Sequence, residues 1–345
     1  MLQLIFNKKG VRLLSGFVFF IINYSFSQSN IGQRTFDFMD TSRNRQIITE
    51  IWYSTDDVLI ASDKANSPFV RDYTVRNGHL PTTKYPLIIM SHGTGGSRFT
   101  LEWLAQALVK KGFIVAAVDH WGNTFDNKIP VEFVKPWERP LDISFALTSL
   151  LNNAELKPII DTSKIGAAGF SFGGYTVIAL AGGIIDYDAL INYYKTIGKK
   201  EIETPEMPGT GKFLYDVKLL NQMKNVPALK DKRIKAFFAI SPALGSGFLK
   251  RKQVNAIDKP VYIIGTKSDS LAPVKTNARH YHHLLTGSTY FEFPGKTGHY
   301  VMLPEANHFV QKEDPLFFTD AEDVNRHEVH SEVEKMAINF FKEKL

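Results

Sequence analysis

The fold of this chain is decided at residues 165–174, where the sequence reads IGAAGFSFGG. The stretch begins as a small apolar strand, breaks at a turn with Ser171 at its apex, and continues into an apolar run, 175–181, that is typical of a buried helix. Gly169 and Gly173 flank the serine, because a strained turn leaves no room for neighbouring Cβ atoms. A serine held between a strand and a helix in this way is the pattern of a nucleophile elbow.

Strands and helices alternate on both sides of this elbow. Upstream, the apolar strand 85–90 precedes a segment from Leu101 to Val109 with apolar residues at helical spacing, and the apolar strand 113–118 follows. Strands that are apolar throughout and joined by a helix are typical of parallel pairs buried on both faces. The remaining elements that we expect are an N-terminal group of strands within 31–53, a helix at 141–151, strands at 234–240, 261–264 and 290–293, a helix at 274–285 and a C-terminal helix.

This order predicts one doubly wound α/β domain over residues 28–345, with a mostly parallel central sheet and helices on both faces. Residues 184–231 interrupt the rhythm, since they form a long stretch with a Pro/Gly-containing segment at 204–211. We expect an inserted helical cap or lid there. The alternative is a poorly ordered surface excursion.

Two further residues follow predicted strand ends downstream of the serine. Asp269 comes after the strand at 261–264, and His299 comes after the strand at 290–293. Functional groups in an open parallel sheet gather at the carboxyl ends of the strands, and the chain order Ser, Asp, His is that of an α/β-hydrolase. In this chemistry Ser171 is the nucleophile, His299 is the base that takes its proton, and Asp269 holds the imidazole.

Other interpretations of these residues are open at this point. An aspartate in such a turn often caps the next helix, and a histidine in a loop is often only solvated. His308 is a reserve candidate for the base, but it lies further into an acidic loop. The presence of all three members in order favours the catalytic interpretation of Asp269 and His299.

The oxyanion donors are expected at two backbone amides. Phe172 follows the nucleophile and begins a helix, where unpaired N–H groups favour negative charge. The second donor should come from the loop after the strand at 85–90, which reads HGTGG over residues 92–96, and Thr94 is our candidate. The alternative, a phosphate-binding loop, lacks the G-K-[ST] and G-x-G-x-x-G signatures.

Composition and charge limit the partners, the cysteine chemistry and the cellular location that we expect. The 345 residues carry a net charge of +6 with no basic stripe, so nucleic acid is not an expected partner. There is no cysteine, which excludes disulfides, cysteine nucleophiles and cysteine-ligated metals. Lys8, Lys9 and Arg12 precede an apolar run, 13–26, which predicts a signal peptide over residues 1–27 and a secreted or periplasmic protein. The alternative is an uncleaved N-terminal anchor.

The motifs GFSFGG, SHGTGG, DHWGNT and SDSLAPV followed by GH resemble those of bacterial dienelactone-hydrolase-like proteins. That group is similar to platelet-activating-factor acetylhydrolases and to cutinase-like polyesterases. The resemblance spans most of residues 32–345 and implies a serine hydrolase of carboxylic esters, with the triad and the two oxyanion donors at the positions given above. In the polyesterases the acid lies in a D-x-x-A-P-V turn, which residues 269–274 match. True dienelactone hydrolases use a cysteine nucleophile, which is missing here.

We therefore expect an exported esterase that works through an acyl-serine intermediate, without metal or cofactor. The alternatives are a lipase or phospholipase A2-type acetylhydrolase on lipid esters, a peptidase, or a non-catalytic binding protein on the same scaffold. Trp121 and Phe125 are expected to shape an apolar substrate pocket, to which Trp137 could also contribute. Small-molecule or lipid esters are the expected partners, and the sequence does not decide the oligomeric state.

Overall fold

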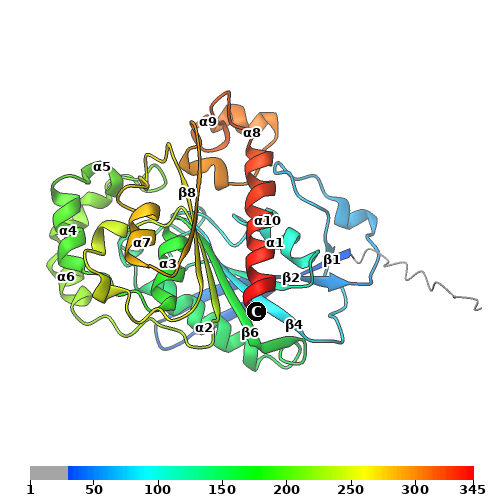
Figure 1. The fold of residues 1–345 in the computed structure, drawn as a ribbon. Coiled ribbons are helices and arrows are strands. Elements are labelled where there is room, and N and C mark those ends of the chain that lie inside the picture. The colour runs from blue at the N-terminus through cyan, green and yellow to red at the C-terminus, as the bar shows by residue number, and fades with distance from the viewer. Residues whose placement is uncertain (1–29) are drawn as a thin grey trace, which may run out of the picture.

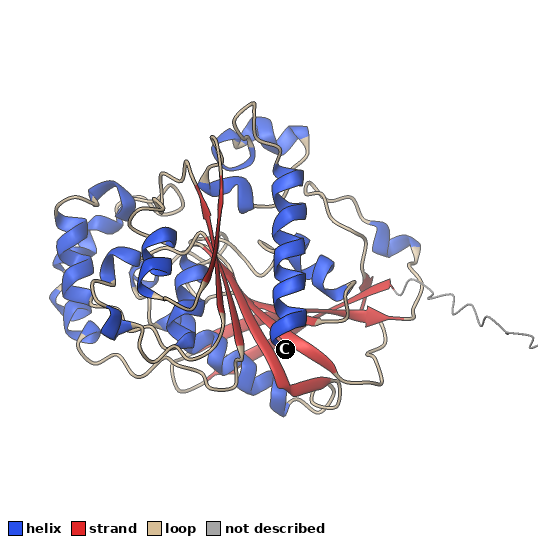
Figure 2. Cartoon of the chain, viewed as in Figure 1, coloured by secondary structure: helices blue, strands red, loops and turns tan. Residues whose placement is uncertain are grey.

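The computed structural model describes residues 30–345, so the predicted signal peptide lies outside the described residues. The core of the molecule is a nine-stranded sheet with the order β3-β1-β2-β5-β4-β6-β7-β8-β9. Figure 2 shows this twisted sheet passing through the middle of the molecule with helices on both sides. The prediction of a mostly parallel sheet covered on both faces is confirmed.

Six neighbouring strands form the parallel part. They are β5 (Ile114–Val118), β4 (Tyr85–Ser91), β6 (Ile160–Phe170), β7 (Ala236–Ile240), β8 (Val261–Thr266) and β9 (Thr289–Phe293). Each pairs in parallel with the next in this order. Because the strands are parallel, their carboxyl ends meet at one edge, which is where functional groups of such sheets gather.

One N-terminal strand, Arg45–Thr55, runs against the direction of the parallel part, whereas Asn30–Asp40 runs along it. β1 (Asn30–Asp40) and β2 (Arg45–Thr55) form an antiparallel pair, and β2 also pairs antiparallel with β5. The two-residue strand β3 (Val75–Arg76) lies at the edge beside β1. The hairpin thereby extends the parallel sheet on the side away from β9.

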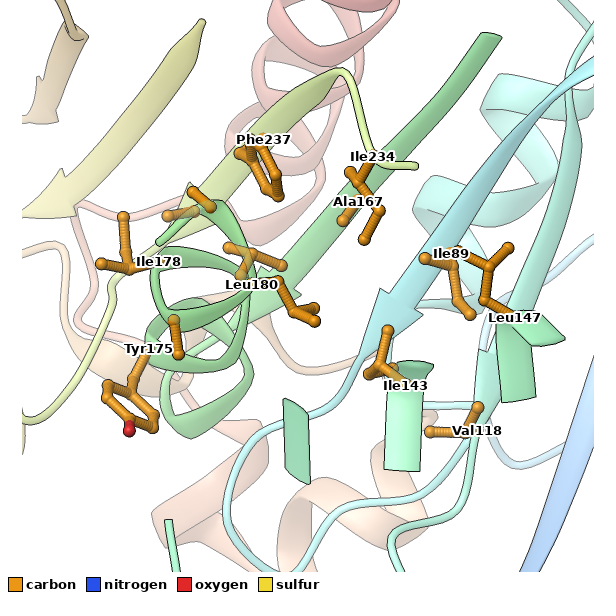
Figure 3. Close-up of a cluster of buried hydrophobic side chains, with 14 of the residues drawn as sticks. Ile89, Val118, Ile143, Leu147, Ala167, Tyr175, Ile178, Leu180, Ile234 and Phe237 are labelled. Atoms are coloured by element: carbon orange, nitrogen blue, oxygen red, sulfur yellow. The ribbon is translucent and has the colours of Figure 1, made fainter. Parts of the chain in front are cut away.

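Alternate residues of the central strands face two separate layers of core. In β4, Leu87 and Ile89 belong to the first layer, while Ile88 and Met90 belong to the second. The first layer is closed by α2 (Glu138–Asn152), α3 (Phe172–Ala181) and α7 (Ala278–Leu284). Figure 3 shows part of it, with Ile143 and Leu147 of α2 beside Ile89 and Val118 of the sheet, and Tyr175, Ile178 and Leu180 of α3 near Phe237.

The second layer is covered by α1 (Glu102–Val109) and α10 (Arg326–Lys344), which contact each other. The α10 helix buries Val333, Ala337 and Phe341 from its apolar stripe against the sheet. Between β9 and α10 the chain forms η6 (His299–Met302), α8 (His308–Glu313) and α9 (Pro315–Phe318). The other short helical turns are η1 (Ala61–Lys64), η2 (Pro130–Val134), η4 (Gly245–Gly247) and η5 (Arg251–Gln253).

Residues between α3 and β7 form a group of short helices. They are α4 (Tyr187–Lys195), α5 (Lys199–Ile202), η3 (Thr210–Tyr215) and α6 (Val217–Met223). In Figure 1 the labels α4, α5 and α6 lie together at the left, on the far side of α3 from the centre of the sheet. We call residues 184–231 the cap segment, and its action as a lid stays a proposal.

No helix within residues 30–345 combines the length and the apolar character needed to cross a lipid bilayer.

Candidate active site

The serine lies at a strained turn between β6 and α3. Ser171 has a φ of 57°, in the left-handed region that non-glycine residues seldom occupy. A Cβ added at Gly169 would lie 2.1 Å from the Gly173 carbonyl oxygen, and one added at Gly173 would lie 1.9 Å from the Ser91 carbonyl oxygen. Side chains at these two positions would therefore collide with backbone, so the flanking glycines are required for the elbow to form.

The three residues that the sequence analysis singled out are in hydrogen-bond contact. His299 Nε2 lies 2.8 Å from Ser171 Oγ, and His299 Nδ1 lies 2.6 Å from Asp269 Oδ2. Asp269 comes from the loop after β8, and His299 begins η6 after β9. The geometry allows the serine hydroxyl to donate to Nε2 while Nδ1–H donates to the carboxylate, which is the arrangement that activates a serine.

Asp269 has two roles at once. Its Oδ1 accepts hydrogen bonds from the backbone amides of Leu271 and Ala272, at 3.0 and 2.7 Å. Its Oδ2 faces the imidazole of His299. The aspartate thus fixes its own turn with one oxygen and holds the histidine with the other, so the turn-capping interpretation and the histidine contact are both compatible with the structure.

The surroundings of His299 favour its protonated form. Burial alone lowers the pKa of an imidazole, but the adjacent carboxylate of Asp269, with a smaller contribution from Glu206, outweighs burial and raises the pKa of His299. A base with this bias accepts a proton from the serine readily and stabilises the imidazolium that forms. His308, the reserve candidate, lies exposed at the start of α8 and has no place in this contact chain.

Thr94 and Phe172 both line the space in front of Ser171. Within residues 30–345 neither backbone amide is bonded to an acceptor, which leaves both able to bind an incoming oxygen. The peptide that carries the Thr94 amide is held through the Gly93 carbonyl, which contacts His92 Nδ1 at 2.6 Å and the Gly96 amide at 3.3 Å. The C=O and N–H of a trans peptide point in opposite directions, so these bonds fix the direction of the Thr94 N–H.

A buried arginine supports this loop from behind. The Arg139 side chain of α2 is 1% exposed, and its Nη2 donates to the carbonyl of His92. Its guanidinium lies 4.7 Å from the ring centre of Phe172, while its Nε and Nη1 find no acceptor among the described residues. Burial lowers the pKa of Arg139 to about 9, which still leaves a positive charge behind the two candidate oxyanion amides at neutral pH. Sequence analysis missed this residue, because an arginine near a helix start normally indicates a solvated position.

A cavity of about 100 Å³ opens at Ser171 and His299. One wall comes from the loops of the main domain, including Phe133, Ala243 and Leu271. The other wall comes from the cap segment. The cap segment contributes mostly apolar side chains, together with two threonines and two carboxylates: Leu190, Ile191, Tyr194, Glu201, Ile202, Thr204, Glu206, Thr210, Phe213, Leu214, Leu219, Leu220 and Met223. The chemistry of the pocket is therefore set largely by the cap segment.

The aromatic residues expected to shape this pocket lie elsewhere. Trp121 packs against the guanidinium of Arg45, 5.4 Å from its ring centre, on a different surface hollow. Phe125 is 69% exposed, and neither residue lines the cavity at Ser171. The strand end after β5 does carry Trp121 to the correct edge of the sheet. The loop then turns toward the N-terminal hairpin, because Arg45 of β2 binds the Trp121 carbonyl at 3.1 Å.

A second series of hydrogen bonds, which also joins a serine, a histidine and an aspartate, lies behind the loop that carries Thr94. Ser91 Oγ is 2.9 Å from His120 Nε2, and His120 Nδ1 is 3.0 Å from Asp142 Oδ2. All three residues are 0% exposed. Asp142 also accepts two hydrogen bonds from Arg45, both at 2.8 Å. The sequence analysis did not single out these residues, because their contacts join a strand, a loop and a helix.

The described part of the chain holds no cluster of three or more His, Asp or Glu side chains arranged to bind a metal ion.

The sheet order and the strand–elbow–helix unit define the chain as an α/β-hydrolase fold. Comparison with solved structures agrees, since a ferulic acid esterase from Streptomyces cinnamoneus superposes with a TM-score of 0.59 at 17% identity, over 93% of this chain and 91% of that one. At this low sequence identity the likeness shows a shared fold and nothing about activity.

Sequence relatives place the chain near named esterases. The family model of platelet-activating factor acetylhydrolase, isoform II, matches residues 64–125. Platelet-activating factor acetylhydrolase of Bos taurus is 33% identical over 147 residues, which cover 30% of this chain and 33% of that protein. Cutinase 2 of Thermobifida cellulosilytica is 22% identical over 62% of this chain and 60% of its own length. The chain spans less than two thirds of either relative, and the resemblance to α/β-hydrolase esterases expected from the motifs is confirmed.

Proposed function

We propose that this protein is a serine hydrolase that cleaves carboxylic esters through an acyl-serine intermediate. The observation that carries the proposal is the hydrogen-bond chain from Ser171 through His299 to Asp269 beside the cavity. The named activities of the sequence relatives, an acetylhydrolase and a cutinase, support an ester as the substrate.

In the proposed reaction Ser171 Oγ attacks the ester carbonyl carbon while His299 Nε2 takes the hydroxyl proton. The carbonyl oxygen becomes an oxyanion that the amides of Thr94 and Phe172 bind, with the charge of Arg139 behind them. His299 then returns the proton to the leaving alkoxide, and the alcohol departs. A water molecule, deprotonated by the same imidazole, attacks the acyl-serine; the bond to Ser171 Oγ breaks, His299 returns the proton to that oxygen, and the acid leaves.

The substrate class follows from the cavity wall. Apolar side chains such as Phe213, Leu214 and Leu219 favour an uncharged acyl or alcohol part. Small-molecule or lipid esters are both compatible with such a wall. The match to platelet-activating factor acetylhydrolase favours a lipid ester as the second candidate substrate. Comparing turnover of acetyl and long-chain acyl esters separates the two.

Export through a signal peptide at residues 1–27, and opening of the cap segment as a lid, belong to the same proposal. The first rests on the basic and apolar pattern of the N-terminal sequence. Mass spectrometry of the protein released by a bacterial host tests it, because a cut before Gln28 leaves a defined N-terminus.

The function itself is tested by labelling the purified protein with a fluorophosphonate and mapping the adduct by peptide mass. We expect modification at Ser171, its loss in His299→Ala, and no modification at Ser91, which serves as an internal control. Absence of labelling in folded protein would show that Ser171 is not activated and would overturn the proposal.

A further inference from the structure

One carboxylate of the cap segment reaches the catalytic loop. Glu206 lies between α5 and η3, and its Oε1 accepts a hydrogen bond of 2.8 Å from the hydroxyl of Tyr300. Tyr300 directly follows His299, and the two rings meet edge to face with centres 5.6 Å apart. Glu206 is therefore one side chain away from the imidazole, although it is distant from His299 in sequence.

Two further contacts hold Glu206 in this place. Its backbone carbonyl accepts a hydrogen bond of 3.1 Å from Lys128 Nζ. Its Cβ packs so closely on the oxyanion loop that a Cβ added at Gly95 would lie 2.9 Å from it. The residue thus touches the loop of the base, the oxyanion loop and the loop after β5. Glu201, the other carboxylate that lines the cavity, instead accepts a hydrogen bond from the Tyr193 hydroxyl of α4.

The charge of Glu206 is not neutralised by a neighbouring cation. Its Oε2 is buried and has no hydrogen-bond partner among residues 30–345. Lys128 binds the backbone of Glu206 and forms no ion pair with its carboxylate in the described structure. The side chains that line the cavity within this range include no lysine or arginine. The field of a buried, unpaired carboxylate acts over several ångströms in such apolar surroundings.

The groups that face His299 are few. Asp269 faces Nδ1 from the loop after β8, and the uncharged Ser171 faces Nε2 from the elbow. Phe170 packs on the ring, with its centre 4.8 Å away. Tyr300 and Glu206 lie on the cavity side, and Glu201 lines the same cavity. Glu206 is thus the second negative charge near the imidazole, and it is supplied by the cap segment.

We propose that Glu206 is a positioning residue for the triad: the cap segment brings its carboxylate against the catalytic loop, where it fixes Tyr300 and stabilises the positive charge that His299 acquires during acyl transfer. This inference rests on the proposed function. It makes catalysis depend on the seating of the cap segment, because the carboxylate leaves the site whenever residues 204–207 move away.

The electrostatic consequence has a definite sign. Burial lowers the pKa of His299, whereas Asp269 and, more weakly, Glu206 raise it. Neutralising Glu206 therefore lowers the pKa of His299. The rising limb of a plot of kcat/KM against pH reports the base in the free enzyme, so this limb moves to lower pH in Glu206→Gln. Since the imidazolium loses a supporting charge, kcat at the plateau falls, by about tenfold.

The matched control is Glu203→Gln. Glu203 carries the same charge on the same segment, is exposed, and accepts hydrogen bonds from the amides of Gly209 and Gly211 at 2.6 and 2.9 Å. Its loss disturbs the cap segment without removing a charge from the cavity. We expect the pH limb of Glu203→Gln to coincide with that of the wild type. In Tyr300→Phe the negative charge of Glu206 stays in place. We therefore expect kcat to fall while the rising limb of kcat/KM against pH keeps its wild-type position.

Two measurements decide the proposal. The first is kcat/KM and kcat from pH 4 to 9 on a short p-nitrophenyl ester for the wild type and the three variants. The second is NMR titration of the His299 ring, which needs no turnover. If Glu206→Gln leaves both the rising limb of kcat/KM and the titration midpoint of the His299 ring at their wild-type positions, the role of Glu206 is overturned, even in an active esterase. A wild type without Ser171-dependent turnover would refute the proposed function instead, and the NMR titration would still decide the coupling.

Discussion

Two Ser–His–Asp chains lie within this one domain. Ser171, His299 and Asp269 are joined by contacts of 2.8 and 2.6 Å, and Ser91, His120 and Asp142 by contacts of 2.9 and 3.0 Å. In both chains the imidazole is bonded to the serine through Nε2 and to the aspartate through Nδ1. The contact distances alone do not separate a reactive serine from a structural one.

The surroundings separate them clearly. Burial, together with the nearby Arg139 charge, lowers the pKa of His120 to about 3, whereas the pKa of His299 is raised. Asp142 is committed to Arg45, and although burial raises its pKa, this pairing outweighs burial and holds the pKa well below its usual value. Ser171 and His299 line a cavity, while Ser91 and His120 are 0% exposed. A base needs access and a field that favours its cation, and only His299 has both of these.

The largest contrast is expected from removing each serine hydroxyl. Ser171→Ala should lower kcat by about 10⁴- to 10⁶-fold, because the nucleophile is lost. Ser91→Ala should keep wild-type turnover and lose about 1 kcal/mol of unfolding free energy with its buried hydrogen bond. Initial rates on an acetyl ester and urea unfolding measure the two effects. Comparable activity losses in both variants would abolish the distinction between the chains.

The second contrast concerns the aspartates. Asp269→Asn should lower kcat by about 10⁴-fold with little effect on folding, because the imidazole loses its orienting anion. Asp142→Asn should instead cost about 3–5 kcal/mol of stability, since Arg45 keeps a buried charge with one fewer partner. Rates and unfolding curves for both variants test this exchange of roles. A stable Asp142→Asn variant would mean that Glu132, which also pairs with Arg45, is sufficient.

The third contrast is in the pH dependence of stability. His120 has a pKa near 6.5 when unfolded and about 3 when folded, so the unfolded chain binds more protons in this range. Its contribution to stability is present above pH 6.5 and falls by about 1.4 kcal/mol per pH unit below it. His299, with a raised pKa, contributes in the opposite direction and loses its contribution as the pH rises.

Urea unfolding of His120→Asn and His299→Asn at pH 5 and pH 7 measures these slopes. The acid-induced loss of stability should be smaller than in the wild type for His120→Asn and larger for His299→Asn. Identical slopes in both variants would count against the difference in protonation.

Local sequence patterns were sufficient to predict much of the fold and of the candidate site. The apolar strands, the elbow at 165–174 and the strand ends before Asp269 and His299 are local features, and parallel pairing brings such ends together. Thr94 and Phe172 were likewise predicted as oxyanion donors from their positions in the sequence, one in the loop after a strand and the other directly after Ser171. Their catalytic roles stay predictions until activity is measured.

What the sequence could not provide depends on long-range packing. Trp121 is a type of residue that often lines substrate pockets. The direction of its loop, however, is set by Arg45, which lies far away in the chain. Glu206 sits in a Pro/Gly-rich segment that has no periodicity, so nothing local distinguishes it from the exposed Glu203. Arg139 reads as a surface residue until the fold places it under the oxyanion loop.

The backbone bonds of the elbow carry a consequence for synthesis on the ribosome. The Ser171 amide donates to the Ile240 carbonyl at 2.8 Å, and the Ala243 amide donates to the Ser171 carbonyl at 3.0 Å. The turn is therefore completed only after translation has passed residue 243, and the imidazole is added later still, at position 299. A nascent chain therefore carries Ser171 without its proposed base until the segment around residue 299 has been synthesised.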